Sequence, residues 1–265
     1  MLYLLSRYII RYRRSVVRDN LLRAFPELND NERNDIERDF YHHFVNLFLE
    51  SLTMSFCSKK MMKRILKYEN MEVADAVARE RGHQICVFGH QCNWDLTASV
   101  PLWTTTFDSY ALYKQLHNQF FDRMFQRIRE RFGLRSIEHK EAAKRIVWLG
   151  RRSERPILFA FNTDQSPHSP YGCGWVDFFG IKTPAIDGWV KLATRLKMPV
   201  IYLHMKRHGW MRYSVEIEKL CDDASQIEEN KLLQLYFNLL ETDIRKQPGE
   251  YLWSHRRWKY ADKTE

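Results

Sequence analysis

Residues 84–95 have the sequence QICVFGHQCNWD. The first five residues are a short, mostly apolar run that ends at Gly89, and such a run predicts a buried β-strand. The polar residues that follow predict a loop leading into a helix. A buried strand that passes into a helix is the unit from which α/β domains are built, so the stretch indicates a sheet covered by helices.

The same alternation of strands and helices extends over the rest of the chain, without an internal repeat or a linker-like segment. It predicts an α/β fold with a central, mostly parallel or mixed sheet flanked by helices. We expect one domain over residues 1–265. The predicted strands are 84–88, 109–113, 135–138, 156–161, 176–179, 200–204 and 211–219, and the predicted helices are 30–54, 70–80, 118–132, 140–150, 185–196 and 225–246.

The composition excludes several classes of protein. The chain has 265 residues, 45% of them hydrophobic, and a net charge of +9. This hydrophobic content excludes a largely disordered chain, and the lack of an apolar run of about 18 residues excludes a multi-span membrane protein. The five cysteines form no Cys-x-x-Cys pair, so we expect a reducing compartment and no metal site. The excess positive charge predicts an anionic partner: nucleic acid, lipid head groups or an acidic protein.

The N-terminal segment concentrates part of this charge. Residues 1–24 contain six arginines and a single acidic residue, with apolar side chains between them. This pattern predicts amphipathic helices, and we interpret residues 1–28 as a basic, membrane-proximal arm whose arginines meet lipid phosphates. The alternative is an ordinary helix packed on the domain. The segment lacks a signal-peptide cleavage pattern, so secretion is not expected.

Polar side chains follow three of the predicted strands at the point where each strand ends. Because the carboxyl ends of parallel strands meet at one edge of a sheet, we expect these side chains to converge on a pocket. They are His90, Asn93, Trp94 and Asp95 after the first strand, Lys114 and Gln115 after the second, and Asn162, Asp164 and Gln165 after the strand at 156–161.

His90 and Asp95 have the spacing His-x4-Asp. If the chain turns from strand to helix between them, the carboxylate can bond one imidazole nitrogen while the other accepts a proton. Such a pair suits a general base that acts on a substrate hydroxyl. Two alternatives stay open: Cys92 as a nucleophile activated by His90, and a structural histidine that caps the loop.

Several segments, in this order and spacing, resemble the bacterial lipid A biosynthesis (lauroyl/myristoyl) acyltransferases, a branch of the lysophospholipid acyltransferase superfamily. The resemblance covers nearly the whole chain and implies a glycerolipid acyltransferase-like fold. The segments that carry it are 18–27 (RDNLLRAFPE), 89–95 (GHQCNWD), 112–114 (LYK), 127–133 (RIRERFG), 164–165 (DQ), 176–180 (VDFFG), 183–184 (TP), 192–193 (LA) and 244–259 (IRKQPGEYLWSHRRWK).

The resemblance implies direct transfer of a fatty acyl group from a thioester, on acyl carrier protein or coenzyme A, to a lipid hydroxyl. It implies no cofactor and no acyl-enzyme, with His90 as general base and Asp95 as its orienting carboxylate. Oxyanion stabilisation would come from backbone N–H groups near Asn93 and Trp94 or from a basic side chain. The residues expected to bind the phosphorylated lipid acceptor or to line the pocket are Lys114, Arg127, Arg131, Asp164 and Gln165.

The chain departs from the family pattern at three positions. Asp95 replaces the usual Glu, Lys114 replaces the usual Arg, and Cys92 stands where Gly is common. Most of the usual N-terminal membrane helix is absent, so we expect the cytoplasmic face of the bacterial inner membrane, held peripherally or by a truncated anchor. The acceptor stays open between a lipid A precursor, a lysophospholipid and an amino-acid-linked lipid.

Residues 123–152 carry ten Lys and Arg against three acidic residues. A non-catalytic protein that binds lipid or nucleic acid would also use such charge, but no nucleic-acid motif accompanies it, and we expect no nucleic-acid partner. An acidic acyl carrier protein is the partner that we expect this charge to steer.

Overall fold

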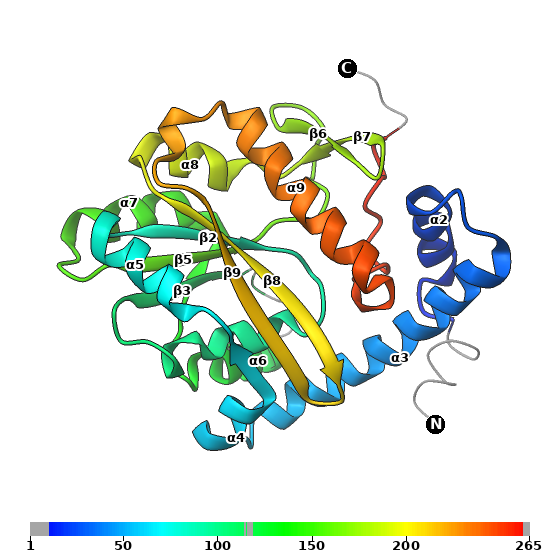
Figure 1. The fold of residues 1–265 in the computed structure, drawn as a ribbon, viewed down its shortest axis with the longest axis horizontal. Helices are drawn as coiled ribbons and strands as arrows, with labels where there is room; N and C mark the ends of the chain where they lie inside the picture. The colour runs from blue at the N-terminus through cyan, green and yellow to red at the C-terminus, as the bar shows by residue number, and fades with distance from the viewer. Residues whose placement is uncertain (1–10, 114, 116–118, 262–265) are drawn as a thin grey trace.

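The computed structural model describes residues 11–113, 115 and 119–261. Its centre is a seven-stranded sheet of order β1-β9-β8-β2-β5-β3-β4, flanked by helices (Figure 1). Every neighbouring pair is parallel except β8 and β9, so the predicted α/β fold is confirmed. The strands of this sheet are β1 (Leu66–Tyr68), β2 (Gln84–Phe88), β3 (Asp108–Tyr113), β4 (Arg135–Glu138), β5 (Ile157–Asn162), β8 (Val200–Gly209) and β9 (Arg212–Cys221).

Helices cover both faces of the sheet because its buried strands carry apolar side chains on both sides. In β2, Ile85 and Val87 join the core beneath α7, α8 and α9, whereas Cys86 and Phe88 join the core beneath α4, α5, α6 and η2. The helices are α2 (Arg14–Ala24), α3 (Asp30–Met54), α4 (Lys59–Ile65), α5 (Met71–Arg81), α6 (Gln119–Glu130), α7 (Ala142–Arg152), α8 (Gly188–Leu196) and α9 (Glu229–Lys246), with the 3-10 helices η2 (Trp94–Leu102), η3 (His139–Glu141), η4 (Ala224–Gln226) and η5 (Pro248–Glu250).

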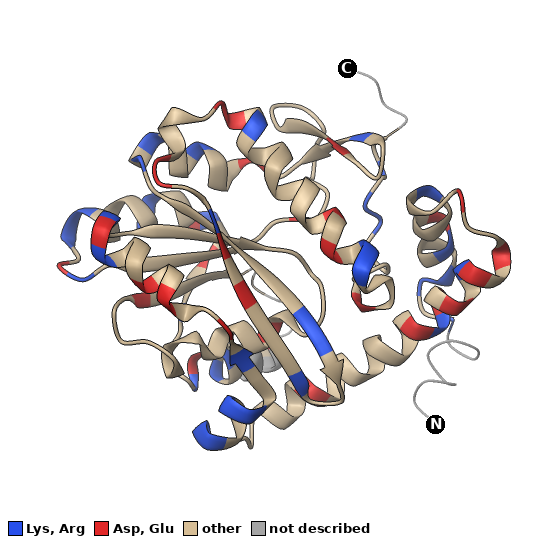
Figure 2. Ribbon diagram, viewed as in Figure 1, with Lys and Arg blue, Asp and Glu red and all other residues tan. Residues whose placement is uncertain are grey.

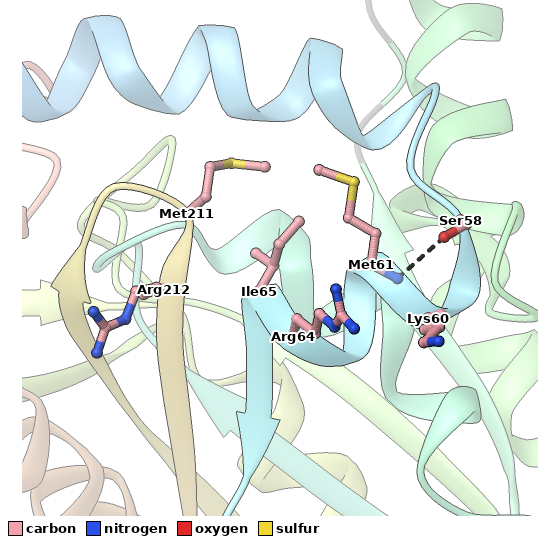
Figure 3. A pocket seen from close by; sticks show the side chains of 7 residues that line it. All are labelled: Ser58, Lys60, Met61, Arg64, Ile65, Met211 and Arg212. Carbon is pink, nitrogen blue, oxygen red and sulfur yellow. Dashed lines mark hydrogen bonds between the residues drawn. The ribbon is translucent and has the colours of Figure 1, made fainter.

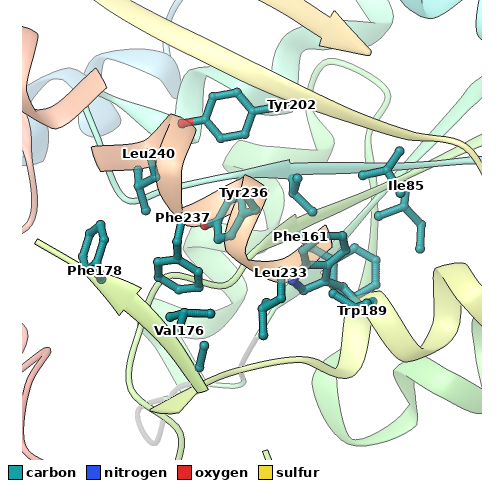
Figure 4. Packing of buried hydrophobic residues seen from close by; sticks show 14 of the residues in the cluster. Ile85, Phe161, Val176, Phe178, Trp189, Tyr202, Leu233, Tyr236, Phe237 and Leu240 are labelled. Atoms are coloured by element: carbon teal, nitrogen blue, oxygen red, sulfur yellow. The ribbon is translucent and has the colours of Figure 1, made fainter. Parts of the chain in front are cut away.

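The aromatic core beneath α9 is where the main sheet meets a second, two-stranded sheet of β6 (Gly174–Phe178) and β7 (Ile181–Ala185). Figure 4 shows Tyr236 and Phe237 of α9 between the strands of the main sheet and Phe178 of β6. The rings of Phe178 and Phe237 meet edge to face, with centroids 5.1 Å apart. Each side chain buried in this way contributes about 1.5–3 kcal/mol to folding.

Most helices and strands lie where the sequence predicted them, and each difference has a cause in the local sequence. The helix α3 begins where the sequence predicted, because Asn29 caps it in a capping box with Glu32. The helix predicted over 225–246 begins later, because Asp223 caps the short helix η4 there and α9 begins only at Glu229. The strand β7 was not predicted, since its Pro184 argues against a central strand; a two-stranded ribbon tolerates it.

The helix α2 packs on the domain, as the alternative interpretation of the N-terminal segment predicted. Val17 and Leu21 are buried in the main core, and Asn20 donates to the carbonyls of Trp253 and His255 at 2.7 and 2.6 Å. Amphipathic helices lying on a membrane are therefore not confirmed. Residues 1–10 lie outside the described residues.

Two arginines of α2 are engaged with α3 rather than turned away from the protein. Arg14 and Arg18 contact the buried carboxylate of Glu37 at 2.7 and 2.8 Å. Burial alone would raise the pKa of Glu37, but the two guanidinium groups lower it below its ordinary value. Across residues 11–113, 115 and 119–261, we find no helix with the length and apolar character needed to cross a bilayer.

Candidate active site

The register of β2 and β5 brings two of the predicted site residues together. Phe88, the last residue of β2, is paired with Asn162, the last residue of β5, and the two strands are parallel. His90 and Asp164 each follow two residues later. They therefore leave the same edge of the sheet at the same height, which is the convergence that the strand ends predicted.

His90 and Asp164 form a two-point contact. The Nδ1 atom of His90 donates to Oδ1 of Asp164 at 2.5 Å, and the backbone N–H of His90 donates to Oδ2 at 3.1 Å. Nδ1 therefore carries the proton, which leaves the lone pair of Nε2 free to accept one.

Asp164 is ionised although it is buried. Burial would raise its pKa, but the charge and hydrogen bonds of His90, with a further hydrogen bond from Tyr251, lower it to about 2. A carboxylate that accepts several charge-assisted hydrogen bonds is stabilised in this way. At neutral pH, Asp164 can thus support positive charge on the imidazole.

The Nε2 atom of His90 faces Gln165 rather than Asp164. The Nε2 atom of Gln165 is 3.4 Å from it, and Trp94 meets the imidazole edge to face at a centroid distance of 4.8 Å. The side chain of His90 is 16% exposed, against 2% for Asp164. A hydroxyl could therefore approach Nε2 while the Asp164 side stays closed to water.

Asp95 occupies a different position from the one that the His-x4-Asp spacing predicts. Its Oδ1 accepts from Nε of Arg129 in α6 at 3.2 Å, whereas the oxygen at Nδ1 of His90 belongs to Asp164. The physical reason is that Asp95 already lies in the first turn of η2. Asp164 follows a neighbouring strand and faces the ring directly.

Cys92 is buried and has a left-handed backbone, with φ of 53°. This conformation explains why glycine would suit the position. The thiol contacts the carbonyl of Met205 and Oε1 of Gln247 at 3.5 and 3.8 Å. Burial raises the pKa of Cys92 well above its ordinary value, so little of the nucleophilic thiolate is present at neutral pH.

Asn93 is held by a buried acidic residue of α3. Its Nδ2 donates to Oε2 of Glu50 at 2.9 Å, and the hydroxyl of Tyr213 donates to the same oxygen at 2.7 Å. Both Asn93 and Glu50 are fully buried. Asn93 therefore fixes the loop after β2, where a substrate-binding role was expected of it.

The C-terminal segment covers this loop from the other side. The N–H of Cys92 donates to the carbonyl of Glu250 at 2.8 Å, and the N–H of Leu252 donates to that of His90 at 3.0 Å. Gly89 allows α9 to pack closely, because a Cβ there would lie 2.3 Å from Cδ1 of Leu240. These contacts hold the backbone of His90 in place from two directions.

The remaining predicted phosphate-binding residues have different surroundings. Arg131 donates to the main-chain carbonyls of Ser55 and Cys57, so it joins α6 to the segment before α4. Arg127 is exposed. Lys114 lies outside the described residues.

The sequence predicted no role for four residues around the site, although three of them lie in segments that carry the family resemblance. Tyr251 forms a hydrogen bond with Asp164. Arg129 forms an ion pair with Asp95, and Glu50 accepts a hydrogen bond from Asn93. His255 accepts from the N–H of Ser166 at 2.9 Å; its burial lowers its pKa to about 4. A signal existed for Glu50, which is the single charged residue in the stretch 44–58.

Within the described parts of the chain, no group of three or more His, Cys, Asp or Glu residues is placed to hold a metal ion. In the comparison with protein families, the model for bacterial lipid A biosynthesis acyltransferases matches residues 3–260. The comparison with curated proteins gave no match.

Proposed function

Because this chain belongs to the bacterial lipid A biosynthesis acyltransferase family, and is thus an acyltransferase, we propose that His90 is its general base. The reaction transfers a fatty acyl group from a thioester, on acyl carrier protein or coenzyme A, to a hydroxyl of a lipid A precursor. The observation that carries this proposal is the 2.5 Å contact of His90 with a buried, ionised Asp164. It leaves Nε2 as a base at the carboxyl edge of the sheet.

The proposed step is a direct displacement. Nε2 of His90 removes the proton of the acceptor hydroxyl while its oxygen forms a bond to the thioester carbonyl carbon. The tetrahedral intermediate then collapses, the carbon–sulfur bond breaks, and the proton on His90 neutralises the departing thiolate. Asp164 stabilises the imidazolium that exists between these events.

The negative charge on the carbonyl oxygen needs donors close to His90. We assign this role to the N–H groups of Trp94 and Asp95, the first two residues of η2, because the first N–H groups of a helix have no carbonyl partner within it. Asp95 holds Arg129 at the same end of η2. In this proposal, Arg129 and the exposed Arg127 bind a phosphate of the acceptor.

The acyl donor that we favour is acyl carrier protein, which is strongly acidic. The exposed Trp148 of α7 lies between two arginines, with guanidinium-to-ring distances of 4.5 Å for Arg145 and 5.1 Å for Arg152. Such a surface can combine attraction of charge with an apolar contact. Turnover on the carrier-protein thioester should therefore fall with salt more steeply than turnover on the coenzyme A thioester; equal salt dependence would contradict this choice of donor.

We place the enzyme on the cytoplasmic face of the bacterial inner membrane, where the lipid acceptor is found. The test is to incubate the purified full chain with an acyl thioester and one candidate lipid at a time. Mass spectrometry should detect one added acyl group on a lipid A precursor, and His90→Ala should abolish it. His168→Ala, which removes an exposed histidine, is the matched control. Transfer to a lysophospholipid or amino-acid-linked lipid alone would reassign the acceptor.

A further inference from the structure

The proposed mechanism does not use the pocket between α4 and the tip of the β8–β9 hairpin. It has a volume of about 550 Å³. Figure 3 shows the thioethers of Met61 and Met211 pointing toward each other across it, with Ile65 between them. Ser58 caps α4, since its Oγ accepts from the N–H of Met61 at 3.1 Å. Met61, Ile65 and Met211 therefore form the apolar floor of the pocket, and the cap by Ser58 fixes the backbone of Met61.

Cations surround this apolar floor. Lys60, Arg64 and Arg212 line the pocket, and the α4 sequence KKMMKRI contains four basic residues and no acidic one. Figure 2 shows basic residues on α4 and at the hairpin tip. We find no carboxylate paired with these three cations in the part of the chain that the structure describes. They are consequently available to an anionic partner.

Large apolar side chains project beside the same cations. Phe56, between α3 and α4, is 86% exposed, and Trp210, at the hairpin tip, is 53% exposed. Met61, which lines the pocket, is 46% exposed. Surfaces that insert between lipid head groups have this composition, in which exposed apolar side chains alternate with cations that have no acidic partner.

We propose that this α4 surface, defined as Phe56, Met61, Trp210, Lys60, Arg64 and Arg212, docks on a bilayer containing anionic phospholipids. Lipid phosphates contact the cations, and the apolar tips enter the head-group layer. The apolar side chains come from three separate segments of the chain. A fluid bilayer can accommodate them without a complementary shape, whereas a folded acidic protein would need a surface that matches theirs. α4 also packs against η2, the helix that begins beside His90. The inference rests on the proposed function for its lipid substrate.

The experiment is co-sedimentation of the full chain with phosphatidylcholine vesicles, with and without phosphatidylglycerol. The double variant Lys60→Glu/Arg64→Glu should weaken partition onto the anionic vesicles about 30-fold or more, as expected for losing about two cation–lipid contacts. Phe56→Ser should leave binding that disappears at high salt, because only the electrostatic part remains.

Matched controls lie elsewhere on the chain. Lys182→Glu/Arg195→Glu changes the net charge equally at exposed sites of β7 and α8, and Tyr171→Ser removes an aromatic side chain that is 83% exposed. These variants should bind vesicles about as well as the unmodified protein. Equal weakening by controls and α4 variants, or equal binding to vesicles with and without phosphatidylglycerol, would overturn the proposal.

Transfer activity on detergent-dispersed substrates separates this inference from the proposed function. The Lys60→Glu/Arg64→Glu variant should keep the unmodified rate in detergent, because its cations lie outside the reacting groups. If it binds vesicles normally but loses turnover on the carrier-protein thioester, the α4 surface docks acyl carrier protein and the membrane proposal is wrong. If the unmodified protein shows no transfer in detergent, the proposed function is wrong. The vesicle experiment still decides whether the α4 surface docks on a bilayer.

Discussion

Replacing Asp164 by Asn removes one charge from the centre of the site and changes little in shape. In the native chain this carboxylate accepts both Nδ1–H and the backbone N–H of His90. An Asn side chain can still accept from the backbone, but its amide would then face Nδ1. That favours the tautomer with the proton on Nε2, where the base must be unprotonated.

The structure gives a range for the expected loss of kcat in Asp164→Asn. The pKa of Asp164 falls from 3.8 to about 2, which corresponds to about 2 kcal/mol of interaction with its surroundings. If only this charge interaction were lost in the transition state, the rate would fall about 30-fold. If the tautomer is also wrong, the loss should approach the roughly 10⁴-fold measured for the equivalent change in a serine-protease triad.

The assay is kcat for acyl transfer under saturating thioester, with thermal unfolding to show that the variant is folded. Asp177→Asn neutralises an exposed carboxylate on β6 and serves as the control. We expect a loss of about 30-fold to 10⁴-fold for Asp164→Asn and none for the control. A folded Asp164→Asn enzyme with a third or more of the native kcat would refute the role assigned to Asp164.

Three further predictions concern the loop and its supports. Glu50→Ala should lower the free energy of unfolding by about 2–4 kcal/mol in chemical denaturation, because it leaves buried donors of Asn93 and Tyr213 unpaired; a loss under 1 kcal/mol would contradict it. Cys92→Ala should keep transfer activity, since a buried thiol with a raised pKa is no nucleophile; abolished transfer in a folded variant would restore the Cys–His alternative. Burial would lower the pKa of His204, but Asp243 and Glu218 raise it, so its charged pair is complete below pH 6.5 and is lost as pH rises through the raised pKa. The destabilisation caused by His204→Gln should therefore be larger at pH 6 than at pH 9, and equal values would count against the pair.

The fold could be predicted from the sequence because its strongest signals are local. The apolar run at 84–88 and the one at 156–161 both became central strands of the sheet, with bounds close to those expected. Elements with weak local signals were missed, such as the three-residue β1 and the proline-containing β7. Their existence depends on pairing with β9 and β6, which no short window of sequence contains.

For the candidate site, the sequence predicted which residues lie close together better than it predicted which of them form hydrogen bonds. His90, Asp164 and Gln165 were expected at one edge of the sheet, and they lie together there. The expected partner of His90 was Asp95, since only four residues lie between them along the chain. The contact to Asp164 spans 74 positions and follows from the register of β2 with β5, a property of the folded sheet.

A double-variant cycle tests whether His90 and Asp164 act as one unit in acyl transfer. The measurement is kcat/KM for His90→Ala, Asp164→Asn and the double variant, on one thioester and one lipid acceptor. Because Asp164 works through the imidazole, the double variant should lose no more activity than His90→Ala alone. Losses that multiply, or His90→Ala activity near the native value, would contradict it.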